Sequence, residues 1–192
     1  PVGPHRVATA MRVAQQARLI VGVDSVASAA PLSAAAASAA VLTTGAAGIA
    51  QDAPAEKTVT LNGFDPDRAT WLDADVFKTL REFRAEGRQF DLIVLDPPKF
   101  APSAQHIDRA ARAYKEINLV GMQLLRPGGL LFTYSCSGAI SMELFQKIVA
   151  GAATDARADA RILRRLSAGT DHPMSAAFPE GEYLKGLLLE KV

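Results

Sequence analysis

The sequence has little of several features that would assign it to a specialised class. Its 192 residues contain one cysteine, so an internal disulfide framework is excluded, and a free thiol suits a reducing cytoplasm, where we expect the protein. The Ala-rich stretch 27–50 is interrupted by proline, hydroxyl residues and glycine, so no membrane span is predicted. The net charge of +1 is not that of a strongly basic nucleic-acid-binding domain.

What the chain does contain is typical of one globular domain, since 49% of its residues are hydrophobic. Apolar runs predict strands, and 3.6-residue periodicities with capping residues predict helices. The strands are predicted at 18–23, 69–72, 90–95, 130–134, 161–166 and 183–190. The helices are predicted at 7–17, at 26–42, between Asp75 and Gly87, at 107–125 and after Ser141. This alternation predicts an α/β fold with a mostly parallel sheet and helices on both faces.

Two of the predicted strands end in residues suited to chemistry. One runs into Asp96-Pro97-Pro98-Lys99, and the other, after the turn 126–129, runs into Ser135-Cys136-Ser137. Carboxyl ends of parallel strands lie at one edge of the sheet, so we expect Asp96 and Cys136 to meet there. Two prolines make a stiff loop that presents carbonyl oxygens and donates no amide hydrogens. A thiolate can add to C6 of a pyrimidine while a carboxyl group holds N3, after which C5 can accept a methyl group.

Each candidate residue also has a plainer interpretation. Asp24 ends a strand where nucleoside-binding α/β proteins place an acid against ribose hydroxyls, but it could equally cap the next helix. Asp75 could hold an adenine amine or only cap its helix. A lone cysteine such as Cys136 is more often a small core residue than a nucleophile. The residues alone leave these alternatives open.

From about Leu61 to its end, the chain resembles the ribosomal RNA large subunit methyltransferase I family. These bacterial enzymes use S-adenosylmethionine to form 5-methylcytosine in 23S rRNA. The resemblance is carried by LNGFD (61–65), DADVFKTLREF (73–83), FDLIVLDPPKF (90–100), AYKEINLVGMQLLRPGGLLFTYSCSG (113–138), ELFQKIVAGAATDA (143–156) and DHPMSAAFPEGEYLKG (171–186). It implies a class I S-adenosylmethionine-dependent methyltransferase (Rossmann-like) fold. Within this single domain, 61–192 would be the catalytic half and 1–60 an atypical Ala-rich part of the cofactor-binding half.

The resemblance also implies roles for individual residues. Asp24 would bind the ribose and Asp75 the adenine of S-adenosylmethionine. Asp96 with the Pro97 carbonyl would hold the target base and also contact the cofactor, and Cys136 would be the nucleophile. No metal site is expected. Three further residues are predicted to contact the substrate, namely Pro98, Lys99 and Tyr114.

The chain also departs from the family pattern. The N-terminal RNA-binding PUA domain and the linking domain of the family are not found in these 192 residues, and the first strand of the sheet with its Gly-rich loop is not recognisable, with only Gly3 at the expected place. The implied partner is a cytosine of 23S rRNA, and a homodimer is compatible with the sequence. Two alternatives remain. One is a purine-directed rRNA methyltransferase, which would need no thiol, and the other is an inactive fold that serves as a binding module.

Overall fold

The computed structural model describes residues 17–18, 21–23, 37–43, 70–72, 75–169 and 173–192. The ribose acid predicted at Asp24 lies outside these residues. So does the helix predicted over 7–17, except for Ala17, which lies in a strand. The fold is therefore best defined from Asp75 onward, where the candidate site is located.

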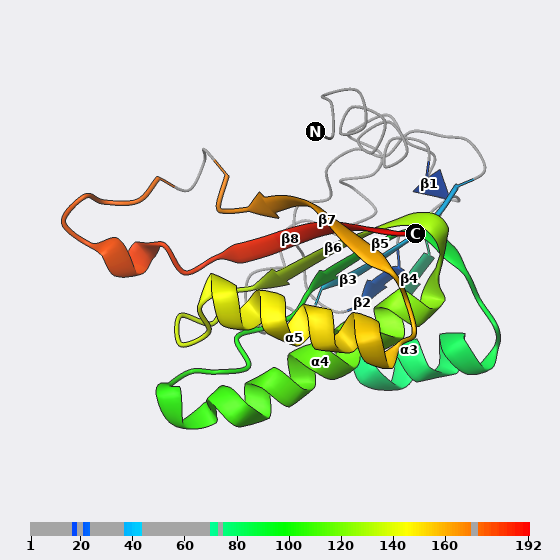
Figure 1. Ribbon diagram of the computed structural model, residues 1–192, viewed down its shortest axis with the longest axis horizontal. Helices are drawn as coiled ribbons and strands as arrows, with labels where there is room; N and C mark the ends of the chain where they lie inside the picture. The colour runs from blue at the N-terminus through cyan, green and yellow to red at the C-terminus, as the bar shows by residue number, and fades with distance from the viewer. Residues whose placement is uncertain (1–16, 19–20, 24–36, 44–69, 73–74, 170–172) are drawn as a thin grey trace.

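A six-stranded sheet with the order β1-β3-β5-β6-β8-β7 forms the centre of the molecule (Figure 1). Strands β1, β3, β5 and β6 run parallel, while β8 is antiparallel to both β6 and β7. A separate pair of parallel strands is formed by β2 and β4. The strand bounds are β1 Ala17–Arg18, β2 Val21–Val23, β3 Ala37–Thr43, β4 Thr70–Leu72, β5 Phe90–Asp96, β6 Leu125–Ser135, β7 Ala160–Leu166 and β8 Lys185–Lys191. The prediction of a mostly parallel sheet is confirmed.

Local signals located the three described α-helices. The Asp75 carboxylate accepts a hydrogen bond from the Lys78 amide at 2.9 Å and begins α3 (Val76–Ala85), as predicted. Gly87, at φ +69°, ends it in the left-handed conformation that glycine adopts without strain. The Ser141 hydroxyl likewise accepts from the Leu144 amide at 3.1 Å and begins α5 (Met142–Asp155). Between them, α4 spans Ile107–Leu124, and two short 3-10 helices lie at Ala104–His106 and Pro179–Gly181.

The helix predicted over 26–42 is wrong for residues 37–42, which lie in β3, and the rest of that prediction lies outside the described residues. Residues 39–43 of this strand pair in register with 92–96 of β5. Alanine favours helices by only a few tenths of a kcal/mol over most residues, so hydrogen bonding to a neighbouring strand can outweigh that preference. In a doubly wound sheet the first strand lies between the second and the fourth. Strand β3, between β1 and β5, occupies that place, which we had expected to be vacant.

The predicted turn at 126–129 is instead a bulge inside β6. Phe90 pairs with Leu125 and Leu92 pairs with Leu130, so one residue of β5 faces four of β6. Gly128 has φ +78° within this bulge, a conformation that explains a glycine at this position. The last strand also begins later than predicted, at Lys185 rather than residue 183.

Helices α3, α4 and α5 lie together on one face of the sheet (Figure 1). The main core lies between them and the strands, and its largest fully buried side chains include Tyr114, Phe90 and Phe145. Because side chains alternate along a strand, Leu92, Leu130 and Leu188 form a second buried cluster on the opposite face. Helices over that face stay a prediction. Among the described residues, no helix has the length and apolar character needed to cross a membrane.

Candidate active site

The candidate site lies at the carboxyl ends of the neighbouring parallel strands β5 and β6. Asp96 is the last residue of β5, and Cys136 follows the last residue of β6. The Cys136 Sγ lies 3.8 Å from the Pro97 carbonyl oxygen, so the thiol donates a weak hydrogen bond to the Asp-Pro-Pro loop. The two segments that were singled out for chemistry therefore meet, as the strand order predicts.

Burial changes the proton affinity of both reactive groups. Desolvation raises the pKa of the Asp96 carboxyl group, because a half-buried carboxylate loses hydration. Desolvation also raises the pKa of the Cys136 thiol, and the negative charge of Asp96 raises it further. The nearby ammonium groups of Lys99 and Lys185 act in the opposite direction on this thiol. A thiolate at Cys136 is therefore easiest to form when Asp96 is protonated.

A buried hydrogen-bonded brace supports the loop behind Cys136. The Ser137 hydroxyl accepts from the Ala101 amide at 3.1 Å and lies 3.0 Å from the Tyr114 hydroxyl, with both side chains fully buried. The Tyr114 ring packs against Phe100, with their centroids 4.8 Å apart. Helix α4, the Asp-Pro-Pro loop and the cysteine loop are thus held together at one point, which fixes the backbone on either side of the site.

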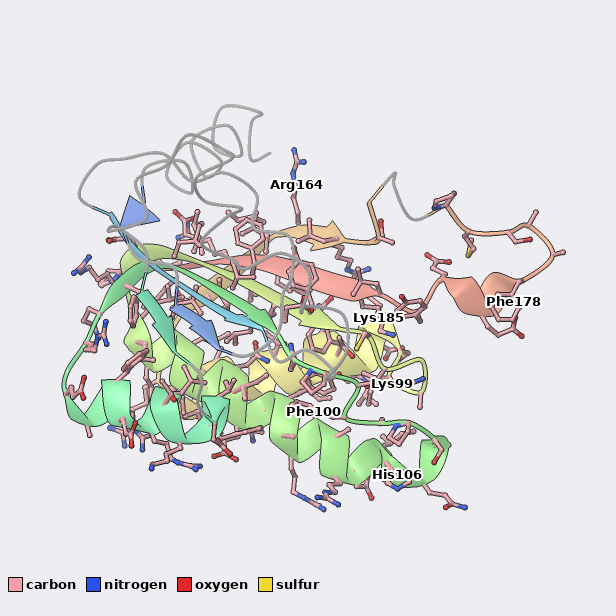
Figure 2. The ribbon with its side chains drawn as sticks, turned by 180° about the vertical axis from the view of Figure 1, so that it is seen from behind. Lys99, Phe100, His106, Arg164, Phe178 and Lys185 are labelled. Atoms are coloured by element: carbon pink, nitrogen blue, oxygen red, sulfur yellow. The ribbon has the colours of Figure 1, made fainter. Side chains whose placement is uncertain are left out.

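Lys185 joins the cysteine loop from another side. It is the first residue of β8 and is 9% exposed. Its Nζ donates to the carbonyl oxygen of Ser137 at 2.8 Å and to that of Tyr183 at 2.6 Å. Figure 2 shows Lys185 and Lys99 at the same end of the molecule. Desolvation lowers the pKa of Lys185, whereas the thiolate form of Cys136 would raise it.

The other predicted site residues occupy different surroundings. Pro98 is half-buried beside Pro97, and Lys99 is exposed, so both can meet a substrate. Tyr114 is fully buried and contacts Ser137, so its predicted contact with the substrate stays a prediction. Asp75 is exposed and caps α3, and its predicted contact with adenine is likewise untested.

The residues at the strand ends fit the methionine side of a cationic nucleoside cofactor. From the described residues the Asp96 carboxylate accepts no hydrogen bond, although it is half-buried at the edge where such sheets bind ligands. Pro97 and Pro98 donate no amide hydrogens, so this loop offers carbonyl oxygens to a positively charged group. Within the described parts of the chain, no group of three or more acidic, cysteine or histidine side chains could hold a metal ion.

Comparison with known proteins identifies relatives over the greater part of the chain. Over 134 residues, 70% of its length, the chain is 56% identical to ribosomal RNA large subunit methyltransferase I of Shewanella amazonensis and 52% identical to that of Shewanella frigidimarina. The protein of the same name from Aeromonas salmonicida is 55% identical over 135 residues. Over its matched part, the chain is closely similar to this methyltransferase family. It spans about a third of the length of these relatives, since the matched region covers 34% of each. No family model matches the chain.

Solved structures show the same fold. The crystal structure of SMU.776 complexed with SAH superimposes with a TM-score of 0.67 at 17% identity, covering 97% of this chain and 49% of that one. The N-methyltransferase NodS from Bradyrhizobium japonicum, in complex with S-adenosylhomocysteine, gives 0.52 at 13% identity and covers 97% of this chain and 86% of NodS. The predicted class I methyltransferase fold is therefore confirmed.

Sequence reasoning missed two residues of this candidate site. Ser137 had been noted only as a neighbour of Cys136, yet it is the centre of the buried brace. Lys185 had no predicted role, although a lysine directly before Gly186 and the run Leu187–Leu189 is unusual for a buried strand. A lysine next to apolar strand residues was the signal that the sequence offered. The role of Lys185 could not be predicted from it, because its hydrogen-bond partner Ser137 lies 48 residues away.

Proposed function

We propose that this protein transfers a methyl group from S-adenosylmethionine to C5 of a cytosine in large-subunit rRNA, with Cys136 as the nucleophile. The observation that carries the proposal is the approach of the Cys136 Sγ to the Pro97 carbonyl, directly beside Asp96, at the carboxyl ends of β5 and β6. The names of the relatives support the RNA substrate and the type of reaction. The proposed compartment is the cytoplasm, where a reactive thiol stays reduced.

The two reactive residues act in sequence on the base. Cys136 loses its proton to water, and the thiolate adds to C6 of the cytosine while the protonated Asp96 gives its proton to N3. Addition at C6 moves the electrons of the C5–C6 double bond toward C5, which becomes the nucleophile. After C5 has gained the methyl group, water takes the C5 proton and the C6–S bond breaks, which releases the thiolate and restores the C5–C6 double bond. N3 returns its proton to Asp96. Burial raises the pKa of Asp96, which favours the protonated carboxylic acid that these reaction steps require.

Residues at the same edge would orient the methyl donor. When bound, S-adenosylmethionine supplies an electrophilic methyl group. Asp96 and the Pro97 carbonyl would face its positively charged methionine end, and Asp75 and Asp24 would hold the adenine and the ribose. Pro98 and the exposed Lys99 would contact the nucleotide. We assign Tyr114 a positioning role, because its hydroxyl holds Ser137 and it is fully buried.

A trapping experiment tests this proposal. The protein is incubated with S-adenosylmethionine and large-subunit rRNA fragments containing 5-fluorocytosine, and adducts are resolved under denaturing conditions. A fluorine at C5 cannot leave as a proton, so the wild type should remain covalently bound to RNA, and Cys136→Ala should form no adduct. Thermal unfolding of Cys136→Ala confirms that the variant is folded.

The product of the reaction on unmodified RNA separates the alternatives. Mass spectrometry of digested RNA should detect 5-methylcytidine with the wild type and none with Cys136→Ala. If the folded Cys136→Ala variant methylates at a near wild-type rate, the thiol is only a packing residue and the proposal fails. A methylated purine in the digest would favour the purine-directed alternative.

A further inference from the structure

Lys185 is a charged residue in a place that does not favour charge. It begins β8 immediately before the buried residues Gly186 to Leu189, and only 9% of it is exposed. Burying an ammonium group is costly unless an anion or several good acceptors compensate for the lost hydration. Within the described parts of the chain, no carboxylate lies within salt-bridge distance of its Nζ. Its Nζ instead donates to two neutral carbonyl groups, those of Ser137 and Tyr183.

The position of these carbonyl groups relates Lys185 to the thiol. Ser137 directly follows Cys136, so the hydrogen bond from Lys185 to the Ser137 carbonyl fixes the backbone next to the sulfur. An ammonium group has three N–H donors, and the two bonds use two of them. The positive charge of the Lys185 ammonium group is close enough to Cys136 for each group to affect the protonation of the other.

We propose that Lys185 is a positioning residue for Cys136, which holds the cysteine loop in place and supplies the buried positive charge against which the thiolate forms. This inference rests on the proposed role of Cys136 as the nucleophile. It explains why a lysine occupies a buried site where methionine would fill a similar volume at lower cost. The thiolate, when it forms during the reaction, is then the anion that faces this ammonium group.

The other groups that face Cys136 do not replace Lys185. Asp96, from β5, opposes the thiolate when it is ionised and raises the thiol pKa. Lys99, from the loop after β5, lowers the thiol pKa, but it is exposed and its charge is screened by solvent and salt. The Tyr114 hydroxyl, from α4, is a neutral neighbour of Cys136, and burial raises its pKa.

The same strand offers a matched control. Lys191, at the other end of β8, also directs its Nζ at two backbone carbonyl oxygens, those of Met122 at 2.9 Å and Leu125 at 2.7 Å. Desolvation lowers the pKa of Lys191 as it does that of Lys185. Lys191 does not act on the protonation of Cys136. Lys191 is only partly buried, but replacing it removes the same kind of two-carbonyl hydrogen bonding without removing a charge from the site.

The test is the pH dependence of alkylation of Cys136, which is the only cysteine among the 192 residues. Iodoacetamide reacts with the thiolate, so the rate profile reports the thiol pKa. Lys185→Gln keeps a hydrogen-bond donor but removes the charge, whereas Lys185→Arg keeps both. We expect Lys185→Gln to move the midpoint to higher pH and to slow alkylation by about tenfold below it, the effect of one pKa unit. Lys185→Arg and Lys191→Gln should keep the wild-type midpoint.

Two outcomes would overturn the inference. A wild-type profile for Lys185→Gln would mean that the charge does not act on the thiol, and an equal shift in Lys191→Gln would mean that any loosening of β8 has this effect. If Lys185→Gln does not fold, Lys185→Met and a salt titration of the wild-type midpoint are used, because a buried charge should leave that midpoint nearly independent of salt. Trapping with 5-fluorocytosine tests the proposed function and does not depend on the alkylation profile. If the wild type is trapped on RNA but Lys185→Gln alkylates with the wild-type pH profile, only the inference about Lys185 is refuted. Failed trapping with a shifted profile refutes only the proposed function.

Discussion

Replacing Tyr114 by phenylalanine tests the buried brace behind the cysteine loop. The change removes one hydroxyl group, whose oxygen lies 3.0 Å from the Ser137 Oγ. The ring itself remains, together with its packing against Phe100 and Phe145 at centroid distances of 4.8 and 5.6 Å. The perturbation is therefore confined to hydrogen bonding at a fully buried point.

The magnitude follows from what is left unpaired. Ser137 still accepts from the Ala101 amide, but its own hydroxyl group loses the neighbouring oxygen of Tyr114. A buried polar group that loses its partner costs about 1–3 kcal/mol of folding free energy. For a chain of this length each kcal/mol lowers the melting temperature by about 2–4 °C. Tyr134→Phe is the matched control, because its hydroxyl bonds none of the described residues, and we expect a change below about 0.5 kcal/mol.

Urea unfolding monitored by circular dichroism measures both variants. Tyr114→Phe should lower the midpoint while the dependence of the free energy on urea stays unchanged, which indicates a loss of stability rather than a change in the unfolded state. The reasoning would be refuted by a Tyr114→Phe variant as stable as the wild type, or by equal losses in Tyr114→Phe and Tyr134→Phe.

Two further predictions concern close packing and pH. Gly186→Ala should lose about 1–3 kcal/mol in urea unfolding, because a Cβ there would lie 2.6 Å from the Tyr134 ring, whereas Gly138→Ala, with nothing within 4 Å of its Cβ, should be nearly neutral. Burial raises the pKa of Asp96 above 3.8, so its contribution to stability is complete below that pH and is lost as pH rises through the folded-state pKa. Asp96→Asn should therefore be more stable than the wild type at neutral pH, with the difference shrinking toward acid. A constant difference across pH would contradict this cause.

Much of the fold could be predicted because the decisive interactions are local. Asp75 and Ser141 each cap a helix through an amide three residues away. Gly87 ends α3 through its own backbone conformation. The meeting of Asp96 with Cys136 could also be predicted from the sequence, since parallel neighbouring strands place their carboxyl ends at one edge.

Tertiary structure decided the conformation of β3 and the position of Lys185, because the residues that pair with them are distant along the chain. The Ala-rich residues of β3 favour a helix when taken alone and became a strand through pairing with β5, about 50 residues later. The position of Lys185 depends on a carbonyl group 48 residues earlier, brought to it by an antiparallel pairing that no local pattern specifies. The sequence alone thus determined the ends of the described helices and the two reactive loops. Long-range hydrogen bonding decided which strand fills the centre of the sheet and which charge lies beside the thiol.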